Sequence, residues 1–187
     1  MERVTVNDRR VIASQIGREP RGVSAVSRRC AYGHPAVIRV HPVVDGEPFP
    51  TLYWLTCPYL ALGVDRLESE GAIGRLEARL ASDAELASRL EVAREEYVRG
   101  RLELLSASER RDLQERGILP SLSEKGIGGI AERGRIKCLH LHVAQALAGA
   151  NPIGEIVLED LERIECPPEK VICSTPVRVE QIVQIKR

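Results

Sequence analysis

Apolar residues recur at helical spacing along most of the chain, and this pattern predicts a mainly helical protein. The longest run covers residues 84–105, where apolar residues return about every 3.6 positions and charged residues occupy the other faces. Shorter runs, bounded by glycines or by capping residues, predict helices over residues 7–17, 60–70, 73–80, 106–116, 136–148 and 155–164.

Short runs rich in β-branched and aromatic residues predict a small sheet. Residues 36–44 and 51–56 are two such runs, and the turn-forming pair Asp45–Gly46 lies between them, so they are expected to form an antiparallel hairpin. Further short strands are predicted at residues 23–28, 171–173 and 177–185.

These elements predict an α+β fold, mostly helical, with a small antiparallel sheet. The chain has 187 residues, a length that suits one domain. We expect residues 1–165 to form this domain and residues 166–187 to form a C-terminal extension with short strands, because Cys166 is followed by two prolines that break the preceding pattern.

The charge balance narrows the class of protein. The chain has 27 basic and 27 acidic residues, so its formal net charge is zero, which argues against general nucleic-acid binding. No apolar stretch approaches the ~18 residues that span a bilayer, and residues 1–10 lack the apolar core of a secretory signal. We therefore predict a cytoplasmic protein that does not enter a membrane.

The five cysteines are the first candidate for chemistry. Their number is odd and the predicted compartment is reducing, so a disulfide framework is not expected. Cys30, Cys57 and Cys138 lie at the predicted ends of strands or helices, where they could converge on one metal ion. With a histidine they would complete a tetrahedral zinc site, and an iron–sulfur cluster held by the three thiolates is the alternative.

Two histidines near Cys138 compete for the fourth position. His142 follows Cys138 by four residues and lies on the same side of a regular helix, whereas His140 points about 160° away from Cys138 at ~100° per residue. Cys138 and His140 can therefore share a metal only if Cys138 lies in the non-helical cap. Both histidines remain candidates on spacing alone.

Cys57 also permits a metal-free interpretation. It directly precedes a predicted helix, where unpaired amide groups and the helix dipole lower the pKa of a thiol. Cys57 or Cys138 could then act as a nucleophile, with His140 or His142 as the base.

A glycine-rich connection followed by basic residues could bind an anion. Gly126, Gly128 and Gly129 precede Arg133, Arg135 and Lys137, which lead into the helix predicted at residue 136. Arginine side chains, backbone amides and a helix N-terminus are common components of phosphate and carboxylate sites. The spacing matches neither a P-loop nor a dinucleotide-binding fingerprint.

Several segments together resemble the bacterial "domain of unknown function 501" family over about residues 8–155. The segments that carry the resemblance are residues 15–22, Cys30, residues 48–58, Arg66-Leu-Glu-Ser69, Ile136-Lys-Cys-Leu-His140, residues 144–147 and Asn151-Pro-Ile-Gly154. The resemblance implies a small cytoplasmic bacterial protein from a family with no established activity. It also implies that Cys30, Cys57, Cys138 and His140 are signature polar positions and favours His140 over His142. This chain has Tyr32 and Gln145 where relatives often have a cysteine and a histidine.

The leading hypothesis is therefore a zinc site made by Cys30, Cys57, Cys138 and a histidine, which binds or acts on a small anionic ligand. A metal-free cysteine-thiol enzyme is the second interpretation. The third is a non-catalytic module that binds a protein partner through the charged helix over residues 84–105.

Overall fold

The computed structural model describes residues 2–174, in which a three-stranded antiparallel sheet lies beside a short two-stranded ribbon. The strands are β1 (Val23–Arg29), β2 (Pro35–Val40), β3 (Val43–Val44), β4 (Glu47–Pro48) and β5 (Tyr53–Leu55). β2 is the central strand and pairs with β1 on one side and β5 on the other. β3 and β4 form the ribbon inside the connection from β2 to β5. The predicted antiparallel pairing is confirmed for β2 and β5, but the first strand expected at residues 36–44 is divided into β2 and β3, and the second is shorter than residues 51–56.

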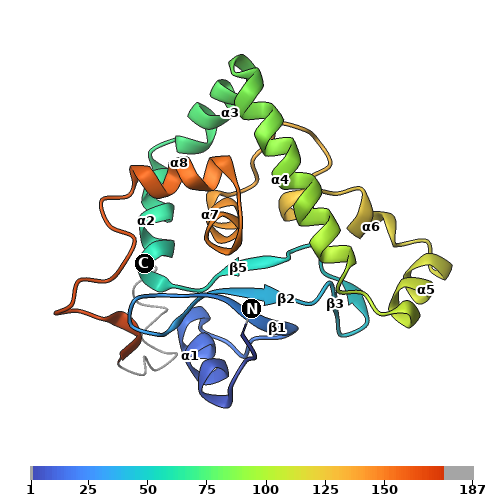
Figure 1. Ribbon diagram of the computed structural model, residues 1–187, viewed down its shortest axis with the longest axis horizontal. Helices are drawn as coiled ribbons and strands as arrows, with labels where there is room; N and C mark the ends of the chain where they lie inside the picture. The colour runs from blue at the N-terminus through green and yellow to red at the C-terminus, as the bar shows by residue number, and fades with distance from the viewer. Residues whose placement is uncertain (1, 175–187) are drawn as a thin grey trace.

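Helices cover both faces of the sheet, so the mostly helical α+β fold is confirmed. The helices are α1 (Val6–Ile16), α2 (Pro58–Ser69), α3 (Ala72–Ser82), α4 (Ala84–Leu102), α5 (Ala107–Glu115), α6 (Pro120–Ser123), α7 (Leu139–Ala148) and α8 (Pro152–Asp160), with 3₁₀-helices η1 (Ile127–Gly129) and η2 (Ile172–Ser174). Figure 1 shows α1 on one side of the sheet and α2, α7 and α8 on the other.

The two faces of β2 divide the core in the way that a strand's alternation requires. Val37 belongs to the large cluster formed with α2, α3, α4, α7 and α8, while its neighbour Ile38 packs with Ile12 of α1. All three side chains are fully buried. Because successive side chains point to opposite faces of a strand, one short strand supplies both cores.

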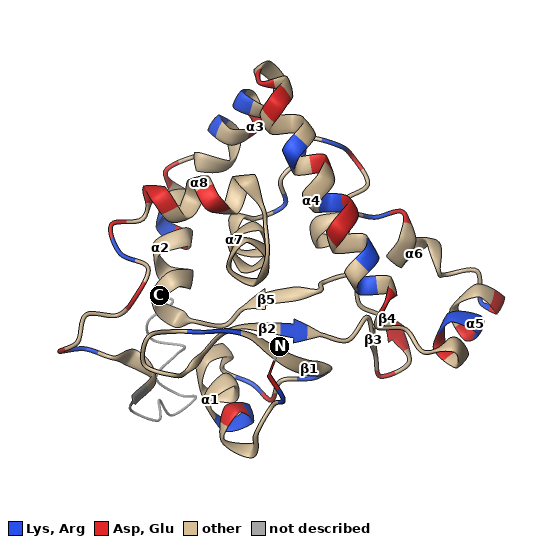
Figure 2. Cartoon of the chain, in the orientation of Figure 1, with Lys and Arg blue, Asp and Glu red and all other residues tan. Residues whose placement is uncertain are grey.

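Helix α7 is the centre of the helical layer. Leu139, Val143 and Ala144 have no exposed surface, and the helix has no Lys, Arg, Asp or Glu, as Figure 2 shows. Helix α8 packs so closely on it that a Cβ atom at Gly154 would overlap the His142 carbonyl oxygen. The glycine therefore permits the close approach of the two helices.

A buried cation organises the connection between α5 and α7. Arg101 of α4 has no exposed surface and its guanidinium lies 5.7 Å from the centre of the Tyr97 ring. The guanidinium donates hydrogen bonds to four backbone carbonyls, those of Pro50, Leu122, Lys125 and Gly126. The glycine-rich connection is therefore an ordered segment that contains α6 and η1.

The C-terminal part differs from its prediction. Residues 171–173 were expected to form a strand, but Ile172–Ser174 forms the 3₁₀-helix η2. β-Branched composition alone does not make a strand without a neighbouring edge to pair with, and here Cys173 is held by the Gln15 side chain of α1 instead. The strand predicted at residues 177–185 lies outside the described residues. Within residues 2–174, the helices are all too short or too polar to cross a lipid bilayer.

Candidate metal centre

The start of α7 lacks a cap from its own chain segment and takes one from α2. Cys138 is the N-cap residue, with an extended backbone (φ −159°, ψ 151°) and no hydrogen bond from its side chain to the first turn. Glu68, near the end of α2, instead accepts the Leu139 N–H at its Oε1 atom over 2.5 Å. A carboxylate at this position is favourable because it meets unpaired amides and the positive end of the helix dipole.

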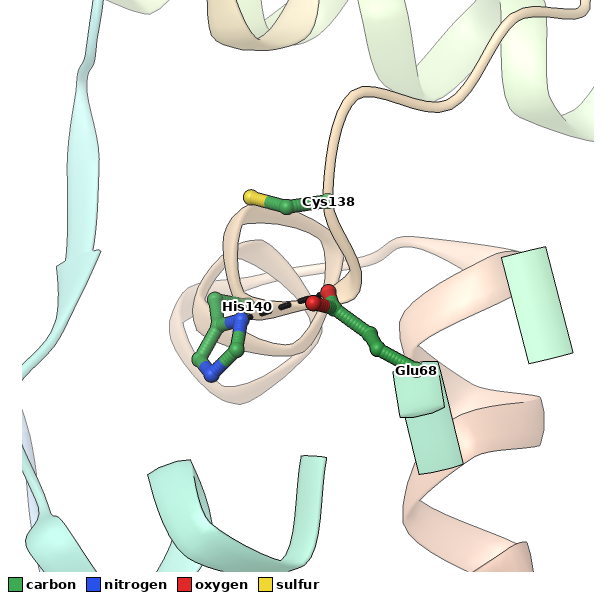
Figure 3. Close-up of side chains that lie close together, drawn as sticks. All are labelled: Glu68, Cys138 and His140. Atoms are coloured by element: carbon green, nitrogen blue, oxygen red, sulfur yellow. Dashed lines mark ion pairs between the residues drawn. The ribbon is translucent and has the colours of Figure 1, made fainter. Parts of the chain in front are cut away.

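This arrangement brings three potential metal ligands together. One ligand atom from each of Glu68, Cys138 and His140 lies within 4.8 Å of the other two, and no other group of three or more Cys, His, Asp or Glu in residues 2–174 meets this distance. Figure 3 shows Glu68 reaching from α2 toward His140, with Cys138 at the start of α7. The extended backbone of Cys138 satisfies the condition under which Cys138 and His140 can share a metal.

The imidazole of His140 is oriented from both sides. Its Nδ1 atom lies 3.3 Å from Glu68 Oε1, inside the cluster. Its Nε2 atom lies 3.3 Å from Asp65 Oδ1 and 3.3 Å from the Ala61 carbonyl oxygen. Histidines that bind metals usually donate their other ring N–H to a carboxylate or carbonyl, which fixes the tautomer. Asp65 and Ala61 occupy that outer position here.

The surrounding charges favour a cation at this place. Burial by itself would lower the pKa of His140, but interactions with the Cys138 sulfur and the carboxylates of Glu68 and Asp65 raise it above its ordinary value. A proton on His140 is thus one way to supply positive charge to the cluster, and a metal ion is another. The side chains of His140 and Glu68 are 24% and 22% exposed, so small ions can reach them.

His142 lies in a different environment. It is 3% exposed, and its Nδ1 atom is 3.2 Å from Asn151 Oδ1. Asn151 in turn donates to Gln145 Oε1, and Gln145 donates to the Ala93 carbonyl oxygen of α4. Burial lowers the pKa of His142 to about 4, although the Asn151 hydrogen bond opposes this shift. His142 therefore lies outside the group of Glu68, Cys138 and His140. Its Nδ1 atom instead contacts Asn151 in the core.

Cys30 and Cys57 are not part of the group formed by Glu68, Cys138 and His140. Cys57 is the N-cap residue of α2 and Cys30 directly follows β1, so both lie at element ends as predicted. Burial raises the pKa of Cys57 to about 12, and amide donors at the helix start, Leu60 foremost, oppose this without reversing it. The expected activation of Cys57 by the helix N-terminus is therefore outweighed by burial, which argues against Cys57 as a nucleophile.

The basic residues expected to bind an anion are placed beside carboxylates. Arg135 lies 2.8 Å from Glu77, and Arg133 lies 3.6 Å from Glu91. The Nζ atom of Lys137 donates to the Gly128 carbonyl oxygen over 3.3 Å. Both arginines and both carboxylates line a groove of about 700 Å³ between α3, α4 and the segment around η1. Because opposite charges balance along the groove, the predicted anion site at Arg133, Arg135 and Lys137 stays a prediction.

Helix α4, proposed as a partner-binding surface, turns its apolar side to the core. Leu86, Leu90, Ala93 and Tyr97 are buried there, and Figure 2 shows acidic and basic residues alternating on its outer faces. The interaction-module interpretation stays a prediction.

Sequence reasoning missed the carboxylates of the cluster. Glu68 belongs to the Arg66-Leu-Glu-Ser69 segment that carries the family resemblance, and Asp65 lies one residue before it. A carboxylate inside a segment singled out for its resemblance was the available signal. Nothing in the sequence, however, shows that the end of α2 meets the start of α7.

Comparison with known proteins identifies a family and nothing closer. Searches of curated proteins and of solved structures gave no match. A family model described as "Protein of unknown function (DUF501)" matches residues 26–159, a segment that includes Glu68, Cys138 and His140. This match covers most of the chain and confirms the resemblance noted from the sequence. The chain therefore belongs to the DUF501 family.

Proposed function

We propose that this protein binds a zinc ion through Glu68, Cys138 and His140 and leaves the fourth coordination position to water or a small anion. The observation that carries this proposal is the meeting of one carboxylate, one sulfur and one imidazole within 4.8 Å. Sulfur and nitrogen donors suit zinc, whereas magnesium and calcium take oxygen ligands almost exclusively. Three protein ligands with an open position are typical of zinc sites that act on a substrate.

The charge of the proposed centre suits such a role. One thiolate and one carboxylate balance the two positive charges of zinc, and the open position can then hold water, hydroxide or a small anion such as phosphate or a carboxylate. Zinc would take the place of the proton that His140 holds at low pH, so binding should release protons and weaken as the pH falls.

Zinc titration of the full-length chain tests the proposal. After removal of metal with a chelator, Cys138→Ser and Glu68→Gln should each bind about one equivalent of zinc less than the unaltered chain, or bind it far more weakly. Glu70→Gln is the matched control, because Glu70 is another carboxylate at the end of α2 and pairs with Arg66 at 3.0 Å. Equal zinc binding by the unaltered chain and both ligand variants would contradict the proposal.

A cobalt-loaded sample tests the open position. Cobalt(II) replaces zinc and gives an absorption spectrum that responds to its ligands. Addition of inorganic phosphate should change this spectrum if an anion can enter the fourth position. An unchanged spectrum at saturating phosphate would indicate that the metal is closed off and has a structural role.

A metal-free thiol enzyme is a second candidate, and one observation favours it. The Cys138 thiol at the start of α7 interacts with His140, which in turn contacts the carboxylates of Glu68 and Asp65. A thiol, a base and an orienting carboxylate are the components of nucleophilic catalysis by cysteine. Alkylation of the thiols distinguishes the two candidates. Zinc should protect Cys138 if the first is correct, and Cys138 should react fastest whether zinc is present or not if the second is correct.

A further inference from the structure

The five cysteines lie in two parts of the fold, with Cys138 in one part and the remaining four in the other. Cys138 lies in the cluster with Glu68 and His140, whereas the other four lie where the turn after β1, the start of α2 and the C-terminal segment meet. In Figure 1 the red C-terminal segment runs back from α8 past the loop between β1 and β2 and ends at α1. These four come from three parts of the sequence and no neighbouring pair of them makes a metal-binding motif.

Hydrogen bonds hold the C-terminal segment against the turn that follows Cys30. The Tyr32 hydroxyl donates to the Cys166 carbonyl oxygen over 2.9 Å. One residue earlier in each of these two segments, the Ala31 N–H donates to Glu165 Oε2 over 3.2 Å. Cys166 is 9% exposed, so its side chain is directed into the protein. Cys30 and Cys166 are thus held on facing segments.

A second set of hydrogen bonds ties Cys173 and Cys57 to the start of β2. The Gln15 side-chain amide donates both to the Cys173 sulfur (3.2 Å) and to the Pro35 carbonyl oxygen (2.7 Å). The Cys57 N–H donates to the Ala36 carbonyl oxygen over 3.2 Å. The carbonyl groups of Pro35 and Ala36, consecutive residues of β2, are therefore linked to Cys173 (through Gln15) and to Cys57.

The sulfurs are close enough to affect one another. Besides burial, which is the largest cause, the thiols of Cys173 and Cys166 raise the pKa of Cys57. Burial likewise raises the pKa of Cys173, and Cys166 and Cys30 add to this shift. Cys57 and Cys173 are thus each disfavoured as thiolates by burial and by other members of this set. A bound cation reverses this situation, because a thiol that coordinates a metal loses its proton.

We infer that Cys30, Cys57, Cys166 and Cys173 form a second metal centre, in which four thiolates hold a thiophilic metal and fasten the C-terminal segment to the start of β2 and α2. Four cysteines are a common ligand set for structural zinc and for iron–sulfur clusters. Amide donors that stabilise metal-bound sulfur are already in place, from Gln15 to Cys173 and from the backbone of Leu60 and Tyr59 to Cys57.

The spacing of the sulfurs bears on which metal is bound. Tetrahedral zinc with ~2.3 Å bonds requires sulfurs roughly 4 Å apart. No three of these four cysteines have their sulfurs within 4.8 Å of one another, so zinc would require the sulfurs to move closer together. A cluster of several irons spans a wider set of thiolates without this movement. The four-thiolate ligand set is common to both.

Metal and sulfide analysis of the full-length chain, purified without oxygen and without added metal, tests the inference. Cys173→Ser and Cys30→Ser should each lose one centre, and these two side chains are chosen because both are partly exposed and their replacement should not disrupt the core. Cys138→Ser is the matched control, since it should remove the metal bound with Glu68 and His140 and leave the second centre intact. Zinc lost without sulfide identifies a zinc centre, and iron lost together with sulfide identifies a cluster; either result supports the four-thiolate centre.

Cobalt(II) titration of the metal-free Cys138→Ser variant provides a second measurement. This variant retains the four remaining cysteines, so it should still show the strong near-ultraviolet absorption that cobalt gives when several thiolates bind it. Adding Cys173→Ser should reduce that absorption sharply. The inference is overturned if Cys173→Ser and Cys30→Ser contain as much metal and sulfide as the unaltered chain, or if Cys138→Ser abolishes all thiolate–cobalt absorption. These outcomes separate the second centre from the site at Glu68, because each Cys→Ser variant affects only one of the two.

Discussion

His140 and His142 lie two residues apart on α7 and have opposite surroundings. His140 is partly exposed beside the carboxylates of Glu68 and Asp65, and its pKa is raised. His142 is buried against Asn151, and burial lowers its pKa to about 4. A helix turns by roughly 200° over two residues, so two histidines at this spacing can face a partly exposed group of carboxylates and a buried asparagine.

This difference shows that a histidine beside potential metal ligands and a core histidine can share one short motif. His140 has one ring nitrogen inside a cluster of potential ligands and the other directed to an orienting carboxylate. The described contact of His142 is an internal hydrogen bond to an asparagine that also caps α8 at Gly154. We therefore expect substitutions at the two positions to affect different properties, and this expectation can be tested directly.

The largest effect is expected for His142→Ala. The substitution leaves a cavity in the core and removes a partner of Asn151, which together should lower the free energy of unfolding by about 3–4 kcal/mol. His140→Ala should lower it by less than about 1 kcal/mol, because that side chain is partly exposed. Urea unfolding in metal-free buffer gives both values. Similar losses for the two variants would remove the distinction drawn between them.

The pH dependence of stability should also differ in sign between the histidines. The pKa of His142 is about 4 in the folded protein and about 6.5 when unfolded, so acidification protonates the unfolded chain first. Its contribution is present above pH 6.5 and is lost as the pH falls toward 4, by up to about 3 kcal/mol. His140, with its raised pKa, stabilises the fold at low pH and loses that contribution as the pH rises.

Unfolding experiments between pH 4 and pH 9 in the presence of a chelator measure both effects. His142→Asn should flatten the loss of stability below about pH 6.5, and His140→Asn should remove the loss that follows as the pH rises above about 6.5. A His142→Asn chain whose stability still falls with the same slope would show that another group is responsible.

Zinc binding should depend on His140 and not on His142. Loss of one of three protein ligands should weaken zinc binding at this site by more than about 100-fold, since even outer-shell changes weaken such sites by 10–100-fold. Competition with a chromophoric chelator measures the affinity, and Glu70→Gln again serves as the control. An unchanged affinity in His140→Ala would mean that zinc binds elsewhere.

The smallest effect in this series is expected for Asp65→Asn. Asp65 lies 3.3 Å from His140 Nε2 and would act by orienting the imidazole, so its loss should weaken zinc binding on the order of 10-fold. The same substitution should lower the pKa of His140, because it removes a nearby negative charge. NMR titration of the His140 ring measures this shift, and an unmoved pKa would show that Asp65 does not orient the ring.

The fold could be predicted from the sequence to a large extent because its elements follow simple periodic patterns. The 3.6-residue spacing located the helices, and the turn at Asp45–Gly46 located the hairpin. The exception at residues 171–173 arose because three β-branched or small apolar residues have no strand beside them. Local composition cannot show whether a pairing edge is available.

The candidate site could be predicted only in part, for a related reason. Cys138 and His140 were recognisable as a pair that requires a non-helical cap, and the structure meets that requirement. Glu68 was not recognisable, because it precedes Cys138 by 70 residues and reaches it only through the packing of α2 on α7. Likewise, a cysteine at the end of an element signals that it can converge with others but does not indicate with which ones.

The buried guanidinium of Arg101 has a consequence for motion in this protein. The Arg101 side chain alone binds four backbone carbonyls, three of which belong to the segment that carries α6 and η1. This segment therefore cannot break these hydrogen bonds one at a time. Opening would expose these acceptors and a cation together, which makes it a single cooperative event. Backbone amides from residue 121 to residue 130 should therefore exchange with solvent at one common rate, coupled to the last turn of α4, and a site for trypsin at Arg101 should stay protected until that whole unit opens.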